Sequence, residues 1–186
     1  MRTAIVVGAR QSLGFRICSQ LLDSGFVVYG KDYASWQNEQ CEENWMYIGR
    51  NANLHFDYVD DDHDLISEDV DFLIVPLIDF YERDDSNINE QLLIQLQGII
   101  TKPSFAKTTI LLVGPTAIHS RNCKISKGIE ELKLNHKNVK EYCITMDYEQ
   151  ADGALYYKAS NIAHKWTKKE LQNYDEIAQF LIEKIL

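Results

Sequence analysis

The chain has 186 residues, 45% of them hydrophobic and 25% charged, which suits one soluble globular domain with a sizeable core. Its net charge of -9 disfavours binding to nucleic acid or to an anionic membrane surface, because both require a basic face. The sequence contains no internal repeat, low-complexity tract or Pro/Gly-rich linker, so we expect a single domain over residues 1–186.

Apolar, β-branched runs alternate with helical patterns along the chain. This alternation is typical of βαβ units, and it predicts an α/β protein with a three-layer Rossmann fold and a doubly wound, mostly parallel sheet. Strands are expected over residues 3–7, 26–29, 54–59, 71–77, 108–113 and 139–146. Helices are expected over residues 13–23, 89–100, 125–134, 154–171 and 175–185, with a short helix and a loop within 34–53.

The N-terminal segment, Met-Arg-Thr-Ala-Ile-Val-Val-Gly-Ala, has an apolar run too short for a signal peptide or a membrane span. No later stretch is long enough to span a membrane either. The cysteines are scattered without a CxxC pair, which is typical of reduced thiols, and the histidines lack metal-site spacing. We therefore expect a cytoplasmic protein with no metal site and no membrane partner.

A glycine-containing loop, Gly-Ala-Arg-Gln-Ser-Leu-Gly over residues 8–14, lies between the first strand and the first helix. Glycine at a strand end permits a tight turn, and the later glycine lets the helix begin close to the sheet. The N–H groups and dipole of the helix N-terminus then face a pyrophosphate. This arrangement predicts a dinucleotide site formed by Gly8, Arg10, Ser12, Leu13 and Gly14.

An acidic residue, Asp32, follows the second strand, 24 residues after Gly8. A carboxylate there accepts hydrogen bonds from an adenosine ribose and repels a 2′-phosphate, which favours NAD over NADP. Arg10 and Lys31 could instead meet a 2′-phosphate, so NADP stays open. In the alternative interpretation, the glycines only turn the chain and Asp32 only caps a loop.

Residues 8–14 resemble the glycine-rich loop of the short-chain dehydrogenases/reductases, with Ser12 in place of the family's middle glycine. The resemblance implies that Asp57, at the end of the third strand, contacts the adenine. The family's Asn-Asn-Ala-Gly stretch after the fourth strand is absent, since residues 75–79 read Val-Pro-Leu-Ile-Asp. The resemblance covers residues 1–114 and is thin beyond them. It implies an NAD(P)-dependent oxidoreductase acting on a small carbonyl or alcohol.

The family's chemistry implies a helical tyrosine with a lysine four residues later, and a serine after the fifth strand. Residues 156–161, Tyr-Tyr-Lys-Ala-Ser-Asn, resemble the tyrosine stretch, with Tyr157 as acid/base and Asn161 at the lysine position. A neutral residue cannot lower a tyrosine pKa by its charge, and the neighbouring alignment also puts a neutral serine there. Thr116, or else Ser120, stands at the serine position. The resemblance therefore implies a degenerate catalytic site.

Alternatives to a working active site remain open at this stage. The tyrosines could simply pack, because the predicted helix carries an apolar stripe of Leu155, Ala159, Ile162 and Trp166. If residues 139–146 supply the sixth strand out of the usual order, the match at Tyr157 is coincidence. The protein would then be a non-catalytic nucleotide-binding, redox-sensing or scaffold protein, or a structural homodimer. Such a dimer could pair through the apolar face of residues 91–100, whose leucines could equally face the chain's own sheet.

Overall fold

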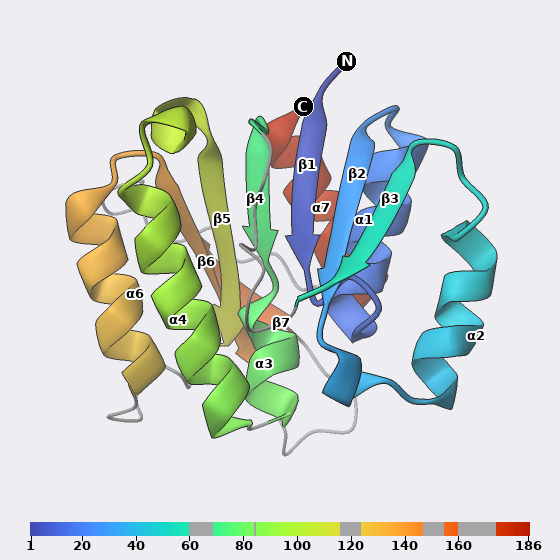
Figure 1. Ribbon diagram of the computed structural model, residues 1–186, viewed down its shortest axis with the longest axis horizontal. Coiled ribbons are helices and arrows are strands. Elements are labelled where there is room, and N and C mark those ends of the chain that lie inside the picture. The colour runs from blue at the N-terminus through green and yellow to red at the C-terminus, as the bar shows by residue number, and fades with distance from the viewer. Residues whose placement is uncertain (60–68, 84, 116–123, 147–154, 160–173) are drawn as a thin grey trace.

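The computed structural model describes residues 1–59, 69–83, 85–115, 124–146, 155–159 and 174–186. They contain a seven-stranded sheet in the order β3-β2-β1-β4-β5-β6-β7 (Figure 1). Strands β1 to β6 all run parallel to one another, and among the described strands only the pairing of β7 with β6 is antiparallel. The strands are β1 (Thr3–Val7), β2 (Val27–Asp32), β3 (Leu54–Tyr58), β4 (Phe72–Val75), β5 (Thr109–Pro115), β6 (Val139–Met146) and β7 (Leu155–Ala159).

Helices cover both faces of the sheet, which gives the three layers of a doubly wound fold (Figure 1). Helices α1 and α7 pack together on one face, and α4 and α6 pack together on the other. The helices are α1 (Ser12–Asp23), α2 (Glu39–Ile48), α3 (Leu77–Arg83), α4 (Ser86–Ile100), α6 (Lys124–Asn135) and α7 (Tyr174–Ile185), with short 3-10 helices at Ala34–Trp36 and Pro103–Lys107. The predicted fold class, a doubly wound and mostly parallel α/β sheet, is confirmed.

Strand β1 shows why the central strands read as unbroken apolar runs. Its successive side chains point to opposite faces, so Val6 enters the core beneath α1 and α7, while Val7 enters the core beneath α4. Both are fully buried, as expected for a parallel strand covered on both sides. No helix in the described part of the chain is long and apolar enough to cross a membrane.

Helix α3 is the main element that the sequence did not predict. Residues 71–77 were expected to form one strand, but β4 ends at Val75 and Pro76 separates it from α3. Proline cannot donate a hydrogen bond to a neighbouring strand, whereas it is tolerated at the start of a helix. The N–H of Asp79 donates to the carbonyl oxygen of Pro76 at 3.0 Å, and this bond closes the first turn.

The helix predicted over residues 154–171 is wrong at Leu155–Ala159, which form strand β7. Tyr157 pairs with Ile144 in the antiparallel ladder between β7 and β6. Aromatic residues favour a strand when a neighbour supplies a hydrogen-bonding edge, and β6 supplies that edge. Residues 160–171 lie outside the described part of the chain. Strand β6 and helix α7 were predicted correctly, each to within a residue.

The apolar face of residues 91–100 belongs to this chain's own core. Leu92, Leu96 and Ile99 are buried against the sheet, and a side chain added at Gly128 of α6 would meet Leu93. Leu92, Leu96 and Ile99 therefore face the chain's own sheet, which was the second of the two alternatives for this segment.

Candidate functional site

The glycine loop lies at the carboxyl ends of β1 and β2, close to the point where the strand order reverses between β1 and β4. Gly8 has a φ of 72°, a left-handed conformation that glycine adopts without strain. Its N–H donates to the carbonyl oxygen of Lys31 at 2.7 Å, and its own carbonyl oxygen accepts from the N–H of Gln11 at 3.0 Å. These bonds turn the chain sharply from β1 into α1.

Gly14 lets helix α1 begin directly against this turn. A Cβ atom at Gly14 would lie 1.9 Å from the carbonyl oxygen of Gly8, a distance that no side chain can accommodate without a backbone shift. The close approach brings the first N–H groups of α1 to the carboxyl edge of the sheet, the geometry that the spacing of Gly8 and Gly14 predicts. Ser12, the first residue of the helix, is exposed to solvent.

The anion position at the N-terminus of α1 is taken by a carboxylate of the chain itself. The N–H of Leu13 donates to Oδ1 of Asp79 at 3.0 Å, and the N–H of Gly14 donates to Oδ2 at 2.9 Å. Asp79 comes from the first turn of α3 and is 2% exposed. Two N–H groups and the positive end of a helix dipole form an anion site, and here an aspartate fills it.

Burial raises the pKa of Asp79 to about 7. The two N–H bonds from Leu13 and Gly14 act in the opposite direction, because they stabilise the ionised carboxylate. The negative charges of Glu82 and Asp32 raise the pKa further. The aspartate that fills the anion position therefore changes charge near neutral pH.

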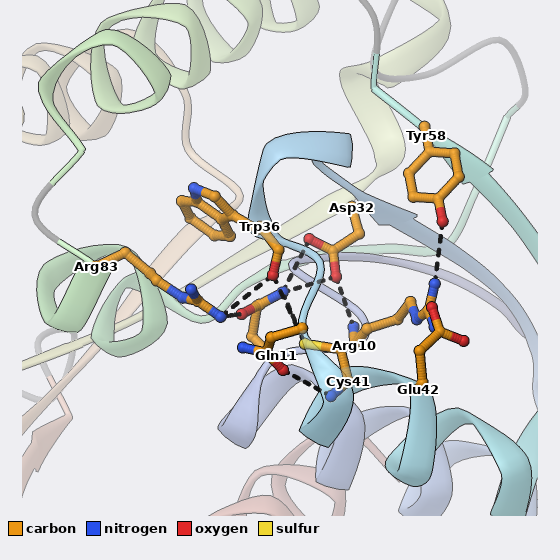
Figure 2. Close-up of polar contacts among 9 residues, drawn as sticks. Arg10, Gln11, Asp32, Trp36, Cys41, Glu42, Tyr58 and Arg83 are labelled. Carbon is orange, nitrogen blue, oxygen red and sulfur yellow. Dashed lines mark hydrogen bonds and ion pairs between the residues drawn. The ribbon is translucent and has the colours of Figure 1, made fainter.

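Asp32 is an internal hydrogen-bond acceptor in this structure (Figure 2). Its carboxylate accepts from the backbone N–H of Arg10 at 3.0 Å, from that of Tyr33 at 2.8 Å, and from Nε2 of Gln11 at 3.0 and 3.2 Å. The residue is 0% exposed, and burial raises its pKa above the ordinary value. In this conformation Asp32 presents no oxygen to a ribose, and it holds the glycine loop against the end of β2.

Arg83 ties helix α3 to the same loop. Its Nη2 donates to Oε1 of Gln11 at 2.7 Å and to the carbonyl oxygen of Trp36 at 3.2 Å. Figure 2 shows Gln11 between Arg83 on one side and Asp32 on the other. The Trp36 ring packs edge-on against Phe80 with centroids 4.7 Å apart, so aromatic side chains fill the core beside the loop.

Arg10, a candidate for contact with a 2′-phosphate, is 3% exposed. Its guanidinium lies 5.4 Å from the ring centres of both Trp45 and Phe56. It donates to the hydroxyl of Tyr58 at 3.0 Å and pairs with Glu42 at 2.5 Å (Figure 2). Side chains of helix α2 and strand β3 thus enclose this cation, and Glu42 pairs with its charge.

Asp57, predicted to contact an adenine, is the most accessible acid of the set. Its side chain is 72% exposed and pairs with Lys31 at 2.9 Å across β2 and β3. These two residues line a groove of about 470 Å³ over the two strands, together with Ile5, Tyr29, Leu54, His55 and Phe56. None of the groove residues belongs to the loop of residues 8–14, so the groove and the anion position are separate features.

The predicted catalytic residues are not brought together with the loop in the described part of the chain. Tyr157 lies in β7, four strand positions from β1, which corresponds to about 19 Å at the usual strand spacing. Because β7 is a strand, the helical spacing on which the tyrosine match depends does not apply at Tyr157. Thr116, Ser120 and Asn161 lie outside the described residues.

Sequence reasoning missed Asp79 and Arg83, which carry the contacts between α3 and the loop. The available signal was the departure at residues 75–79, where an aspartate stands three residues after a proline. An acid in that place suits the first turn of a helix. Its partners, Leu13 and Gly14, lie 66 and 65 residues away in the sequence, so no local pattern pointed to them.

Comparison with known proteins places the fold. No family model matches the sequence, and no curated protein matches it. Among solved structures, BdcA in complex with NADPH superposes with a TM-score of 0.52 at 12% identity, covering 98% of this chain and 86% of BdcA. A protein of Shigella flexneri 2a str. 301, described as a short-chain dehydrogenase, gives a TM-score of 0.51 at 12% identity, covering 78% and 80% of the two chains. AtPrR2 in its apo form gives 0.51 at 15% identity, covering 76% of this chain and 46% of AtPrR2. At these identities the likeness is one of fold, and this chain has the Rossmann-type fold of the short-chain dehydrogenases/reductases.

Proposed function

We propose that the protein binds a nicotinamide dinucleotide, NAD or NADP, at its glycine loop and acts as a non-catalytic, redox-sensing or scaffold protein. The observation that carries the proposal is the anion position at the N-terminus of α1. Two N–H groups converge there on the oxygens of a single carboxylate, at 3.0 and 2.9 Å. The donors suit a phosphate, because the same donors and the same helix dipole serve either anion.

The loop residues would hold the pyrophosphate in this proposal. The N–H groups of Leu13 and Gly14 would donate to it, and Ser12 is exposed beside them. Asp57 would meet the adenine side. The bound nicotinamide supplies or accepts a hydride in proteins that use it for chemistry.

The expected preference for NAD depended on Asp32 as a ribose acceptor. Because that carboxylate is buried and its oxygens accept from the loop, we now expect only a small difference in affinity between NADH and NADPH. Arg10 gives no preference either, since it is buried and its charge is paired with Glu42. A structural neighbour, BdcA, is described with NADPH bound.

A change of charge at Ser12 tests the site directly. In Ser12→Asp, a carboxylate at the start of α1 should repel a pyrophosphate and weaken NADH and NADPH binding about tenfold or more. It should also leave the fold intact, because an acid in the first turn of a helix is favourable. Ser12→Ala is the matched control and should bind like the unmodified protein. Binding is measured by titration of NADH or NADPH fluorescence, and equal affinities in all three proteins would contradict this placement of the site.

The absence of hydride transfer is the second part of the proposal. The supporting observations are that Tyr157 lies in a strand and that the residue four positions later is a neutral asparagine. We expect no oxidation of NADH or NADPH with a panel of small aldehydes and ketones, and no effect of Tyr157→Phe. The alternative is an oxidoreductase with Tyr157 as acid/base and Thr116 as the residue that orients the carbonyl. Turnover that disappears in Tyr157→Phe would establish that alternative.

Cellular location and assembly belong to the same proposal. Cys18, Cys41 and Cys143 are buried free thiols, which supports a reducing compartment such as the cytoplasm. A homodimer would need a surface other than the helix face of residues 91–100. Sedimentation velocity on the purified chain distinguishes a monomer from a dimer.

A further inference from the structure

We propose that Asp79 is a built-in competitor for the nucleotide phosphate, so that a ligand binds the glycine loop only after this carboxylate leaves the N-terminus of α1. The inference rests on the proposed function, because it concerns the regulation of the same site. It goes beyond that function by naming the group that opposes binding and the part of the ligand that displaces it, the pyrophosphate of the dinucleotide.

The geometry of Asp79 matches that of a bound anion. Each of its two oxygens accepts one N–H from consecutive residues at the start of α1, with both distances between 2.9 and 3.0 Å. A phosphate group would use the same two donors, and both anions cannot occupy them together. The carboxylate is held in place by the packing of α3, whose Leu77, Ile78 and Phe80 are fully buried.

The remaining contacts make this occupancy costly for the ionised carboxylate. Burial disfavours its charge, and the nearby charges of Glu82, on the same helix, and Asp32, on β2, are also negative. Two nearby cations are engaged elsewhere: Arg83 of α3 contacts Gln11, and Arg10 of the loop pairs with Glu42. Asp79 is thus stabilised mainly by the two N–H groups and the helix dipole, which are the groups that a ligand phosphate would take over.

The Arg83 contact is a second link between α3 and the loop. Arg83 joins α3 to Gln11, and Gln11 in turn donates to Asp32, so the loop and α3 are connected at two points. A rotation of the Asp79 side chain alone would free the anion position and would leave the Arg83–Gln11 contact in place. We therefore assign the competition to the carboxylate and not to a movement of the whole helix.

The test compares Asp79→Asn and Asp79→Ala with the unmodified protein at pH 8. Glu131→Gln, an identical loss of one charge at an exposed position on α6, is the matched control. NADPH affinity is measured by fluorescence titration, and sulfate binding by the shift in melting temperature. Charge-assisted hydrogen bonds are roughly twice as strong as neutral ones, so we expect about tenfold tighter binding in both Asp79 variants and no change in Glu131→Gln.

The outcomes separate this inference from the proposed function. Tighter NADPH binding in both Asp79 variants supports both proposals. If only sulfate binding is gained, the competitor is supported and the dinucleotide function is overturned. If the unmodified protein binds NADPH and neither variant binds more tightly, the competitor is overturned and the function stands. Binding of neither ligand by any folded variant overturns both.

A second measurement decides the matter if the Asp79 variants fail to fold. Sulfate keeps its charge between pH 6 and pH 8, whereas Asp79 becomes neutral as the pH falls through this range. The unmodified protein should therefore bind sulfate up to about tenfold more tightly at pH 6 than at pH 8. An affinity for sulfate that does not change over this range would overturn the inference.

Discussion

Asp79 links the fold of this protein to its proposed regulation at the level of one residue. It is fully buried, yet it is ionisable, and its only described hydrogen-bond donors are two N–H groups of α1. A buried carboxylate with such partners is close to balance between its charged and neutral forms, which is why its pKa lies near 7. The same residue is therefore expected to affect ligand binding and stability.

The stability of the protein should depend on pH through Asp79. Because its pKa is about 7 in the folded state and near 4 in the unfolded chain, the folded state binds more protons between these values. The free energy of unfolding should therefore fall as the pH rises from about 4 to about 7 and then level off. For one group the slope reaches about 1.4 kcal/mol per pH unit.

Urea unfolding of the unmodified protein and of Asp79→Asn at several pH values between 5 and 8 measures this contribution. The asparagine variant should show a shallower dependence over that range. Asp32 contributes in the same direction, because its pKa is also raised, and its contribution remains in the variant. Identical pH profiles for the two proteins would show that Asp79 does not titrate in this range.

At the scale of elements, the position of α1 depends on the turn that precedes it. The helix starts close to the sheet because Gly14 has no side chain to meet the carbonyl oxygen of Gly8. Gly8 in turn adopts a left-handed conformation and leaves room for that approach. The two glycines therefore act together, and the anion position exists because both are present.

Gly14→Ala should test this arrangement. The added Cβ would lie 1.9 Å from the Gly8 oxygen, so the helix must shift away from the turn, and we expect a loss of several kcal/mol in unfolding free energy. Gly98→Ala in α4 is the matched control, because a Cβ there meets no atom within 4 Å. Replacing a helical glycine by alanine at such an open position is expected to stabilise by about 0.5–1 kcal/mol. Chemical denaturation measures both, and equal effects would contradict the packing argument.

Helix α3 is the element that distinguishes this site from an open nucleotide loop. It follows β4 after Pro76, and it presents Asp79 and Arg83 to the loop from the same side. Leu77, Ile78 and Phe80 are packed in the core, and this packing holds the helix beside the loop. The sequence in this region departs from the short-chain dehydrogenase pattern, and the departure coincides with the part of the structure that fills the anion position.

At the scale of the whole molecule, the fold places the site and the predicted tyrosine on different parts of one sheet. The loop lies beside β1 and β2, whereas Tyr157 lies on β7, which is the edge strand beyond β6. Helices α1 and α7 cover one face, and their packing brings the C-terminal segment against the first helix. Arg2 donates to the carbonyl oxygen of Ile185 at 2.9 Å, so the first and last residues of the described chain lie side by side.

The sequence by itself determined the alternation of strands and helices, the turn at residues 8–14 and the fold class. These features follow from local patterns, because unbroken apolar runs mark buried strands and glycine spacing marks the turn. The sequence also pointed to Asp32 at the end of β2, although it could not show that the carboxylate is buried. Both interpretations of Asp32 were compatible with its position along the chain.

Only the tertiary structure showed which side chains contact the glycine loop. Asp79 reaches α1 across more than sixty residues of sequence, and Arg10 is enclosed by side chains from α2 and β3. Residues 155–159 form a strand because they pair with the edge of β6. Local propensity does not reveal such a pairing, because it depends on a distant strand. The physical reason is the same in each case: burial and hydrogen bonding depend on groups that are distant in sequence and adjacent only after folding.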